Sequence, residues 1–106
     1  MKALNKNNFG DEVLKEKDKR VMLFFYGEND DSSEVLASIL LKMEEGFDQI
    51  KFCKINAEEE KMMAFNYQAL EVPHLILMEK GEVIGSINGA GSEEDILTLI
   101  QVKKGL

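Results

Sequence analysis

The sequence predicts an α/β domain in which a central mixed sheet of four to five strands is flanked by helices on both faces. Residues 21–26 form an unbroken apolar and aromatic run, which is typical of a central strand buried on both sides. Helical and strand patterns alternate along most of the chain, which ends in a hairpin followed by a helix. Helix-linked strands followed by a hairpin favour a mixed sheet covered on both faces.

The composition indicates a single soluble domain over residues 1–106. The chain is 44% hydrophobic and 31% charged, and no apolar run approaches the roughly 18 residues of a membrane span. Residues 1–6 lack the apolar stretch of a signal peptide, so we expect a cytoplasmic protein. The net charge of −7 repels nucleic acid and anionic membranes, so we expect neither as a partner. The oligomeric state stays open.

Periodicity places two helices in the first half of the chain. The first covers residues 9–17 with Asn8 as its cap, and a short strand near Ala3 and Leu4 precedes it. The second helix ends near Gly46, and Asp31 and Glu34 have the spacing of a capping box at its start. Its predicted apolar stripe consists of Val35, Leu36, Ile39, Leu40 and Met43.

The second half predicts a strand at residues 49–56, a short helix at 58–68, and a hairpin of strands 75–78 and 83–87. Ser92 caps a final helix. The residues of this helix expected to face inward are Ile96, Leu97, Leu99 and Ile100. Four methionines are expected to fill gaps in the core rather than to form an adaptable binding patch, namely Met43, Met62, Met63 and Met78.

Several short segments, taken in their order and spacing, resemble the thioredoxin family over about residues 8–101. The segments that carry the likeness are residues 8–9, 13–15, 25–40, 54–56, 71–77, 80–83 and 89–90. The resemblance implies the thioredoxin fold and a cis peptide bond before Pro73. It also implies that residues 30–33 occupy the place of the family's redox motif, Cys-Gly-Pro-Cys.

The chain departs from the family at this motif. The two cysteine positions fall on Asp30 and Ser33, the preceding tryptophan falls on Asn29, and the family's buried aspartate falls on Phe24. Dithiol exchange needs an attacking thiolate and a resolving thiol, and a carboxylate and a hydroxyl form no mixed disulfide. We therefore expect no dithiol oxidoreductase activity, no catalytic residue in this turn and no cofactor.

Two interpretations of the turn remain open. In the first, the turn only stabilises the following helix, because a carboxylate at a helix N-terminus contributes roughly 0.3–1 kcal/mol. In the second, the groove between the turn and the proline loop still binds a protein or peptide, with the backbone of Val72 pairing as in strand addition. An acidic rim that includes Glu71 would favour a basic or polar segment. The predicted binding residues are Asn29, Asp30, Asp31, Ser32, Ser33, Val72 and Pro73.

Two other functions are weaker alternatives. Cys53 is the single cysteine, so it forms no internal disulfide, and it is either an inert strand residue or a lone redox thiol that works with a partner. Oxygen ligands from Glu28, Asp30 and Asp31, or the last two with His74, could hold a metal ion, but no loop spacing resembles a calcium site. We expect no metal, and we expect His74 to be a structural hydrogen-bonding residue.

Overall fold

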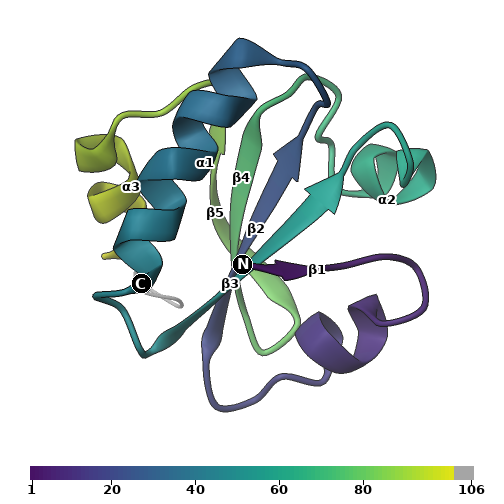
Figure 1. Ribbon diagram of the computed structural model, residues 1–106. Helices are drawn as coiled ribbons and strands as arrows, with labels where there is room; N and C mark the ends of the chain where they lie inside the picture. The colour runs from purple at the N-terminus through teal and green to yellow at the C-terminus, as the bar shows by residue number, and fades with distance from the viewer. Residues whose placement is uncertain (102–106) are drawn as a thin grey trace.

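A five-stranded mixed sheet forms the centre of the computed structural model, which describes residues 1–101 (Figure 1). The strand order is β1-β3-β2-β4-β5; β1 and β2 each run parallel to β3, and β4 is antiparallel to both β2 and β5. The strands are β1 (Lys2–Ala3), β2 (Arg20–Tyr26), β3 (Ile50–Asn56), β4 (His74–Glu79) and β5 (Glu82–Asn88). The predicted mixed sheet and its short first strand are confirmed, while residues 102–106 of the predicted domain lie outside the described part.

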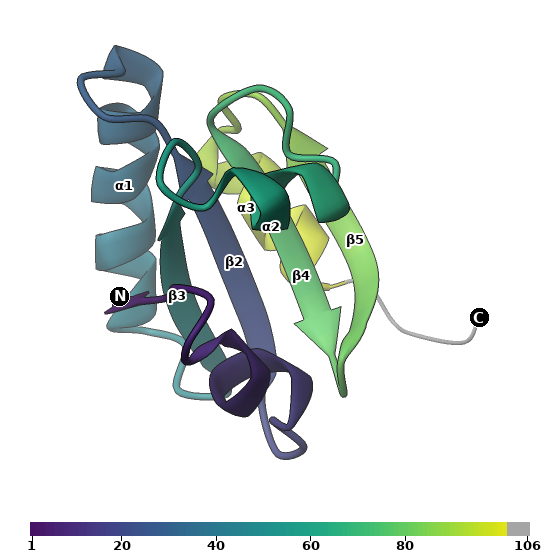
Figure 2. The same ribbon diagram turned by 90° about the vertical axis from the view of Figure 1, so that its right-hand side faces the viewer.

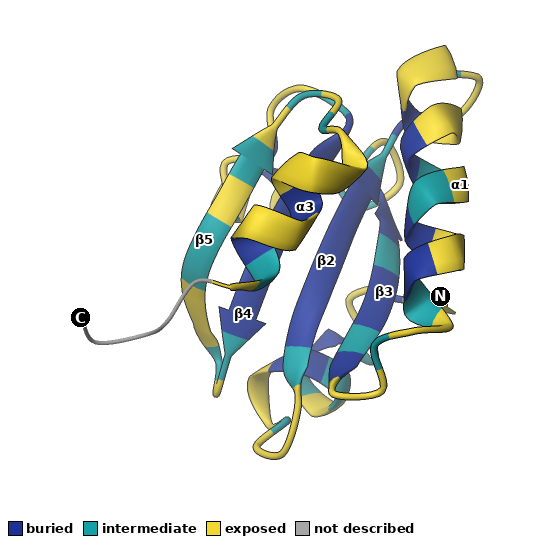
Figure 3. Cartoon of the chain, turned by 90° about the vertical axis from the view of Figure 1, so that its left-hand side faces the viewer, coloured by how far each residue is buried: buried dark blue, intermediate teal, exposed yellow. Residues whose placement is uncertain are grey.

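Strand β2 occupies the middle of the sheet, as its uniform apolar pattern predicts. Its residues 21–25 are all buried, and Figure 3 shows the strand dark blue along most of its length. Phe24 lies in register with Lys54 of β3 on one side and with Leu75 of β4 on the other. Alternate residues of β2 therefore contribute to two separate apolar cores, one on each face of the sheet.

The helices cover both faces of the sheet, which also agrees with the prediction. A short π-helix, η1 (Gly10–Leu14), and α2 (Lys61–Asn66) lie on one face (Figure 2). The other face carries α1 (Asp31–Glu44) and α3 (Glu93–Ile100) (Figure 3). Within residues 1–101, no helix has the length and apolar character needed to cross a membrane.

Two predicted helices are shorter than expected. The Asn56 side chain accepts hydrogen bonds from the backbone amides of Glu58 and Glu59, which holds these residues in a turn and delays α2 to Lys61. Asn8 was predicted to cap the first helix, but its Oδ1 instead accepts from the backbone amide of Asn5. The Asn8 cap is therefore wrong.

Several residues predicted to face the core are exposed. In α1 the buried apolar stripe is Leu36, Leu40 and Met43, while Val35 is 62% exposed. In α2, Met62 is 76% exposed, so the prediction that it fills a gap in the core is wrong. Leu97 of α3 is also exposed, whereas its neighbours Ile96 and Leu99 are buried.

The hairpin and the last helix form as predicted. Lys80 and Gly81 both have positive φ angles of 51° and 80°, the conformation that a tight two-residue hairpin turn requires. Ser92 is the N-cap of α3. Its hydroxyl accepts a hydrogen bond from the backbone amide of Asp95, and the Asp95 carboxylate accepts one from the backbone amide of Ser92, which completes a capping box.

Candidate functional site

The predicted turn lies where β2 ends and α1 begins. The loop that leads from α2 into β4 reaches the same end of the sheet, and so does the loop between β3 and α2 (Figure 2). Three loops from distant parts of the sequence therefore meet beside Asp30 and Ser33. This placement follows from the parallel direction of β2 and β3 and the antiparallel direction of β4.

Asp30 and Ser33 are joined by a hydrogen-bonded network. The Oδ2 atom of Asp30 accepts from the backbone amide of Ser33 at 2.9 Å and from its hydroxyl at 2.7 Å. The Ser33 Oγ atom in turn accepts from the backbone amide of Gly27 at 3.1 Å. Ser33 is only 2% exposed, so its hydroxyl is satisfied inside the turn rather than offered to a ligand.

This network makes Asp30 the N-cap of α1. The sequence predicted a capping box one residue later, from Asp31 to Glu34, and that assignment is wrong. Asp31 instead occupies the first helical position, where it is exposed and adds negative charge to the helix N-terminus. Both acidic residues therefore stabilise the start of α1, in agreement with the helix-stabilising interpretation of the turn.

The turn and the proline loop contact each other through Gly27 and Val72. A Cβ atom added to Gly27 would lie 2.8 Å from Cγ2 of Val72, so no larger residue fits there without a shift. The peptide bond between Val72 and Pro73 is cis, and the carbonyl of Pro73 accepts from the backbone amide of Gly89. The structure thus brings together the two segments that the sequence predicted to form one surface.

The predicted binding residues divide by exposure. Exposed are Asn29, Asp31 and Ser32; partly exposed are Asp30 and Val72; buried are Ser33 and Pro73. The first three side chains can contact a partner directly. Ser33 is instead a support beneath the surface, and Pro73 is buried with its carbonyl bonded to Gly89, so Val72 is the predicted residue of this loop left to contact a partner.

The site includes a contact that sequence reasoning missed. Glu28 Oε1 accepts a hydrogen bond from Nδ2 of Asn56 at 2.8 Å, which ties the turn to the end of β3. Asn56 is only 6% exposed, and the same side chain holds the turn at Glu58 and Glu59. A buried asparagine at the end of an apolar strand was the available signal, because such a side chain needs partners.

Two of the three turn carboxylates considered as metal ligands, those of Glu28 and Asp30, accept hydrogen bonds from neighbouring residues. Glu28 bonds to Asn56 and Asp30 bonds to Ser33. His74 lies on β4, where its Nδ1 is 3.2 Å from Oδ1 of Asn88 on the neighbouring strand. Across residues 1–101 no group of three or more acidic, histidine or cysteine side chains is arranged to hold a metal ion.

Cys53 lies in β3 between β1 and β2, and none of its surface is exposed. Burial raises the pKa of its thiol from 9.0 to about 11. Only a small fraction of such a thiol is ionised near neutral pH, and the thiolate is the reactive form. The burial and the raised pKa of Cys53 therefore favour an inert strand residue over a lone redox thiol.

Phe24 and Lys54 lie side by side below the turn. Phe24 packs in the core at the position that the resemblance assigns to the family's buried aspartate, so β2 offers Lys54 no carboxylate there. Both residues line a pocket of about 190 Å³ with Tyr26, Ser33 and Glu34. The carboxylate in this lining is that of Glu34 in the first turn of α1, while β2 contributes none.

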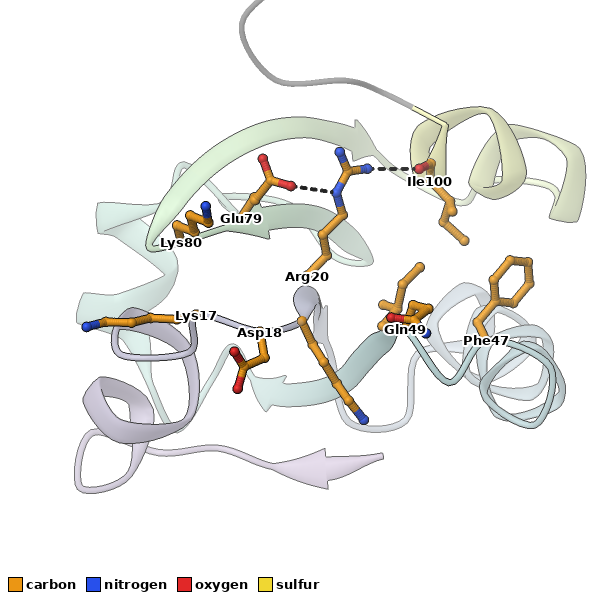
Figure 4. Close-up of a pocket in the computed structure, with 10 residues that line it drawn as sticks. Lys17, Asp18, Arg20, Phe47, Gln49, Glu79, Lys80 and Ile100 are labelled. Atoms are coloured by element: carbon orange, nitrogen blue, oxygen red, sulfur yellow. Dashed lines mark hydrogen bonds and ion pairs between the residues drawn. The ribbon is translucent and has the colours of Figure 1, made fainter.

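A second hollow, of about 380 Å³, lies at the opposite end of the sheet (Figure 4). Arg20 reaches from the start of β2 to donate from Nε to Oε1 of Glu79 at 3.1 Å and from Nη1 to the carbonyl of Ile100 at 3.0 Å. These bonds brace β2 against β4 and against the C-terminal end of α3, whose carbonyls favour a cation. The guanidinium group of Arg20 is therefore engaged in structural contacts.

Comparison with known proteins agrees with this architecture. The model of the thioredoxin family matches residues 1–102, which is nearly the whole chain. No significant match to a curated protein was found. The strand order, the helices on both faces and the turn between β2 and α1 are consistent with that match. The chain therefore belongs to the thioredoxin family, with Asp30 and Ser33 at the positions expected of the redox cysteines.

Proposed function

We propose that this domain is a non-catalytic module that binds a protein or peptide through the turn at Asn29–Ser33 and the loop at Val72 and Pro73. The observation that carries the proposal is the hydrogen bond between Asp30 and Ser33, because these two residues stand where dithiol chemistry would need cysteines. Neither side chain can exchange disulfides. The contact between Gly27 and Val72 nevertheless keeps the turn and the loop together as one surface.

The backbone of Val72 supplies a means of recognition. Within residues 1–101, neither its amide nor its carbonyl has a hydrogen-bond partner, although the chain is paired in β4 from His74 onward. An extended peptide could pair with these groups as an added strand, a mode in which main-chain bonds give affinity and side-chain contacts give specificity. Asp31 and Glu71, both exposed, supply an acidic rim on the two sides.

The test compares retention of partners from a native extract by the wild-type domain and by an Asp31→Arg, Glu71→Arg variant. These two side chains are exposed, and neither takes part in the Asp30–Ser33 network. Reversing both charges should therefore change the surface without unfolding the domain. The matched control is Glu45→Arg, Asp48→Arg, which makes the same charge change in the loop between α1 and β3.

A partner that is retained by the wild type and by the control variant, but lost from the Asp31→Arg, Glu71→Arg variant, supports the proposed surface. Equal retention by all three proteins contradicts it and moves the interface elsewhere on the fold. Circular dichroism of each variant shows whether a loss of binding reflects a loss of structure.

A further inference from the structure

Three large apolar side chains are exposed around α2. Met62 is 76% exposed, Phe65 is 60% exposed and Leu70 is 77% exposed. Met62 and Phe65 are three residues apart in the helix, so they share one face. Single exposed apolar residues are ordinary, but here two share one helical face and a third follows in the adjoining loop, and we call these three residues the patch.

The patch is a consequence of how α2 packs. Ala64 is the buried residue of this six-residue helix, and Met63 and Tyr67 pack partly against the core. That contact turns Met62 and Phe65 outward. The backbone amide of Ala69 then bonds to the carbonyl of Ala64, so the chain folds back at the end of the helix before Leu70.

Negative charge surrounds the patch. Residues 58–71 contain four glutamates and a single lysine, Lys61. Glu58, Glu59 and Glu60 precede α2, and Glu71 follows Leu70. Within residues 1–101 none of the four glutamates has an ion-pair partner, although Glu60 accepts a hydrogen bond from the backbone amide of Lys6. The charge of this rim is therefore left for a partner to neutralise.

We propose that the exposed face of α2, together with Leu70, docks an amphipathic basic segment of a partner protein. Apolar side chains of that segment cover Met62, Phe65 and Leu70, and its lysines or arginines face Glu58, Glu59 and Glu71. Methionine suits this role because its unbranched thioether adapts to irregular surfaces. The inference deepens the proposed function by naming the chemistry of the partner, and it extends the surface from the Val72 loop onto α2.

Charge complementarity selects this occupant over a second copy of the chain. The domain carries a net charge of −7, so a second copy would bring more negative charge to the acidic rim. An anionic membrane is disfavoured for the same reason. A basic segment gains from the rim and buries the apolar side chains in the same contact.

The test uses two synthetic peptides that carry leucines at helical spacing. One peptide has lysines at alternate polar positions, and the other has glutamates at the same positions. Binding is measured by titration, and the contact is mapped by amide chemical shifts of the domain. The lysine peptide should bind, move the resonances of α2 and Leu70, and lose affinity as salt is raised above about 0.15 M. The glutamate peptide should not bind.

Two variants decide whether the patch is responsible. Phe65→Ser should weaken binding of the lysine peptide by about tenfold or more, as expected for a central aromatic contact. Leu41→Ser is the matched control, because Leu41 is 50% exposed on α1 at the other face of the sheet, and it should leave binding unchanged. A Glu58→Gln, Glu59→Gln variant should bind more weakly and with a smaller dependence on salt.

Other outcomes overturn the inference. Equal binding by Phe65→Ser and the wild type, or equal binding of both peptides, would remove it. A dimer in sedimentation that Phe65→Ser converts to a monomer would also remove it. Shifts confined to residues 29–33 and Val72 would contradict this inference while supporting the proposed function. Shifts confined to α2 and Leu70 would support this inference and contradict the proposed function.

Discussion

The hydroxyl of Ser33 donates a 2.7 Å hydrogen bond to Oδ2 of Asp30, and this bond links the two positions where the resemblance to the thioredoxin family places cysteines. The same carboxylate caps α1 through the backbone amide of Ser33. A polar network thus stands where a redox pair would stand. It stabilises the turn and the helix start.

Asp30→Ala should destabilise the domain by about 2 kcal/mol. The change removes an N-cap, worth about 1 kcal/mol, and leaves the buried hydroxyl and amide of Ser33 without their acceptor. Asp30→Asn should cost less, because asparagine is also a good N-cap. Urea denaturation of both variants measures this. A loss below about 0.5 kcal/mol for Asp30→Ala would show that the network contributes little.

An Asp30→Cys, Ser33→Cys variant should regain an oxidisable dithiol. The first new thiol would lie at the N-terminus of α1, where a thiolate is stabilised. Thiol titration before and after oxidation should show the loss of both new thiols in an intramolecular disulfide. The single Asp30→Cys variant is the control and should keep its thiol. A folded double variant that keeps both thiols after oxidation would mean that the turn lacks the redox geometry.

Gly27→Ala should destabilise the domain by about 1–3 kcal/mol, because the added methyl group would press against Cγ2 of Val72. Removing that atom with Val72→Ala should relieve part of the loss, so the double variant should be more stable than the two single losses predict. A double-mutant cycle in urea measures the coupling. Additive losses would show that the turn and the proline loop are independent.

The sequence predicted the architecture well because each element had a strong local pattern. The apolar run at residues 21–26 predicted a strand buried on both faces, and Ser92 was predicted as the cap of the last helix. The N-cap of α1 was misplaced because Asp30–Ser33 and Asp31–Glu34 have the same spacing. The choice between them depends on where β2 ends, which spacing does not reveal.

The candidate site was less predictable because its supporting contacts are long-range. Glu28 and Asn56 are 28 residues apart, and nothing in the sequence near either one names the other. Met62 was predicted to fill a gap in the core from its apolar character. A six-residue helix buries few positions, so most of its side chains face solvent whatever their type.

The stability of the domain should fall in acid partly through Glu16. Hydrogen bonds from Lys51 and from the backbone of Asp18 lower its pKa from 4.5 to about 2. A depressed pKa in the folded state contributes stability that is complete above the unfolded value and is lost as the pH falls from about 4.5 to about 2. Glu16→Gln should therefore be less stable at neutral pH, and its stability should fall less steeply over this range.

The control for this acid effect is Glu45→Gln, which changes an exposed glutamate without an ion pair among the described residues. Denaturant midpoints measured across the same pH range should follow the wild type. If Glu16→Gln and Glu45→Gln give the same pH profile, the pairing with Lys51 contributes nothing measurable to stability.

Cys53 should react slowly with a thiol reagent in the native domain and quickly in denaturant. Its side chain is buried, and its pKa of about 11 keeps it protonated near neutral pH. The labelling rate should follow the opening of the sheet, so destabilising variants such as Asp30→Ala should speed it. Fast labelling of the native protein would instead favour a lone redox thiol.

The most direct test of the account is hydrogen exchange of the domain, free and bound to a partner retained by the wild type. The amide of Val72 has no hydrogen-bond partner within residues 1–101, so it should exchange rapidly in the free domain. The account predicts that binding protects this amide together with those of Asn29–Ser33. Protection confined to another face, with Val72 unchanged, would contradict the claim that the former redox surface is now a binding surface.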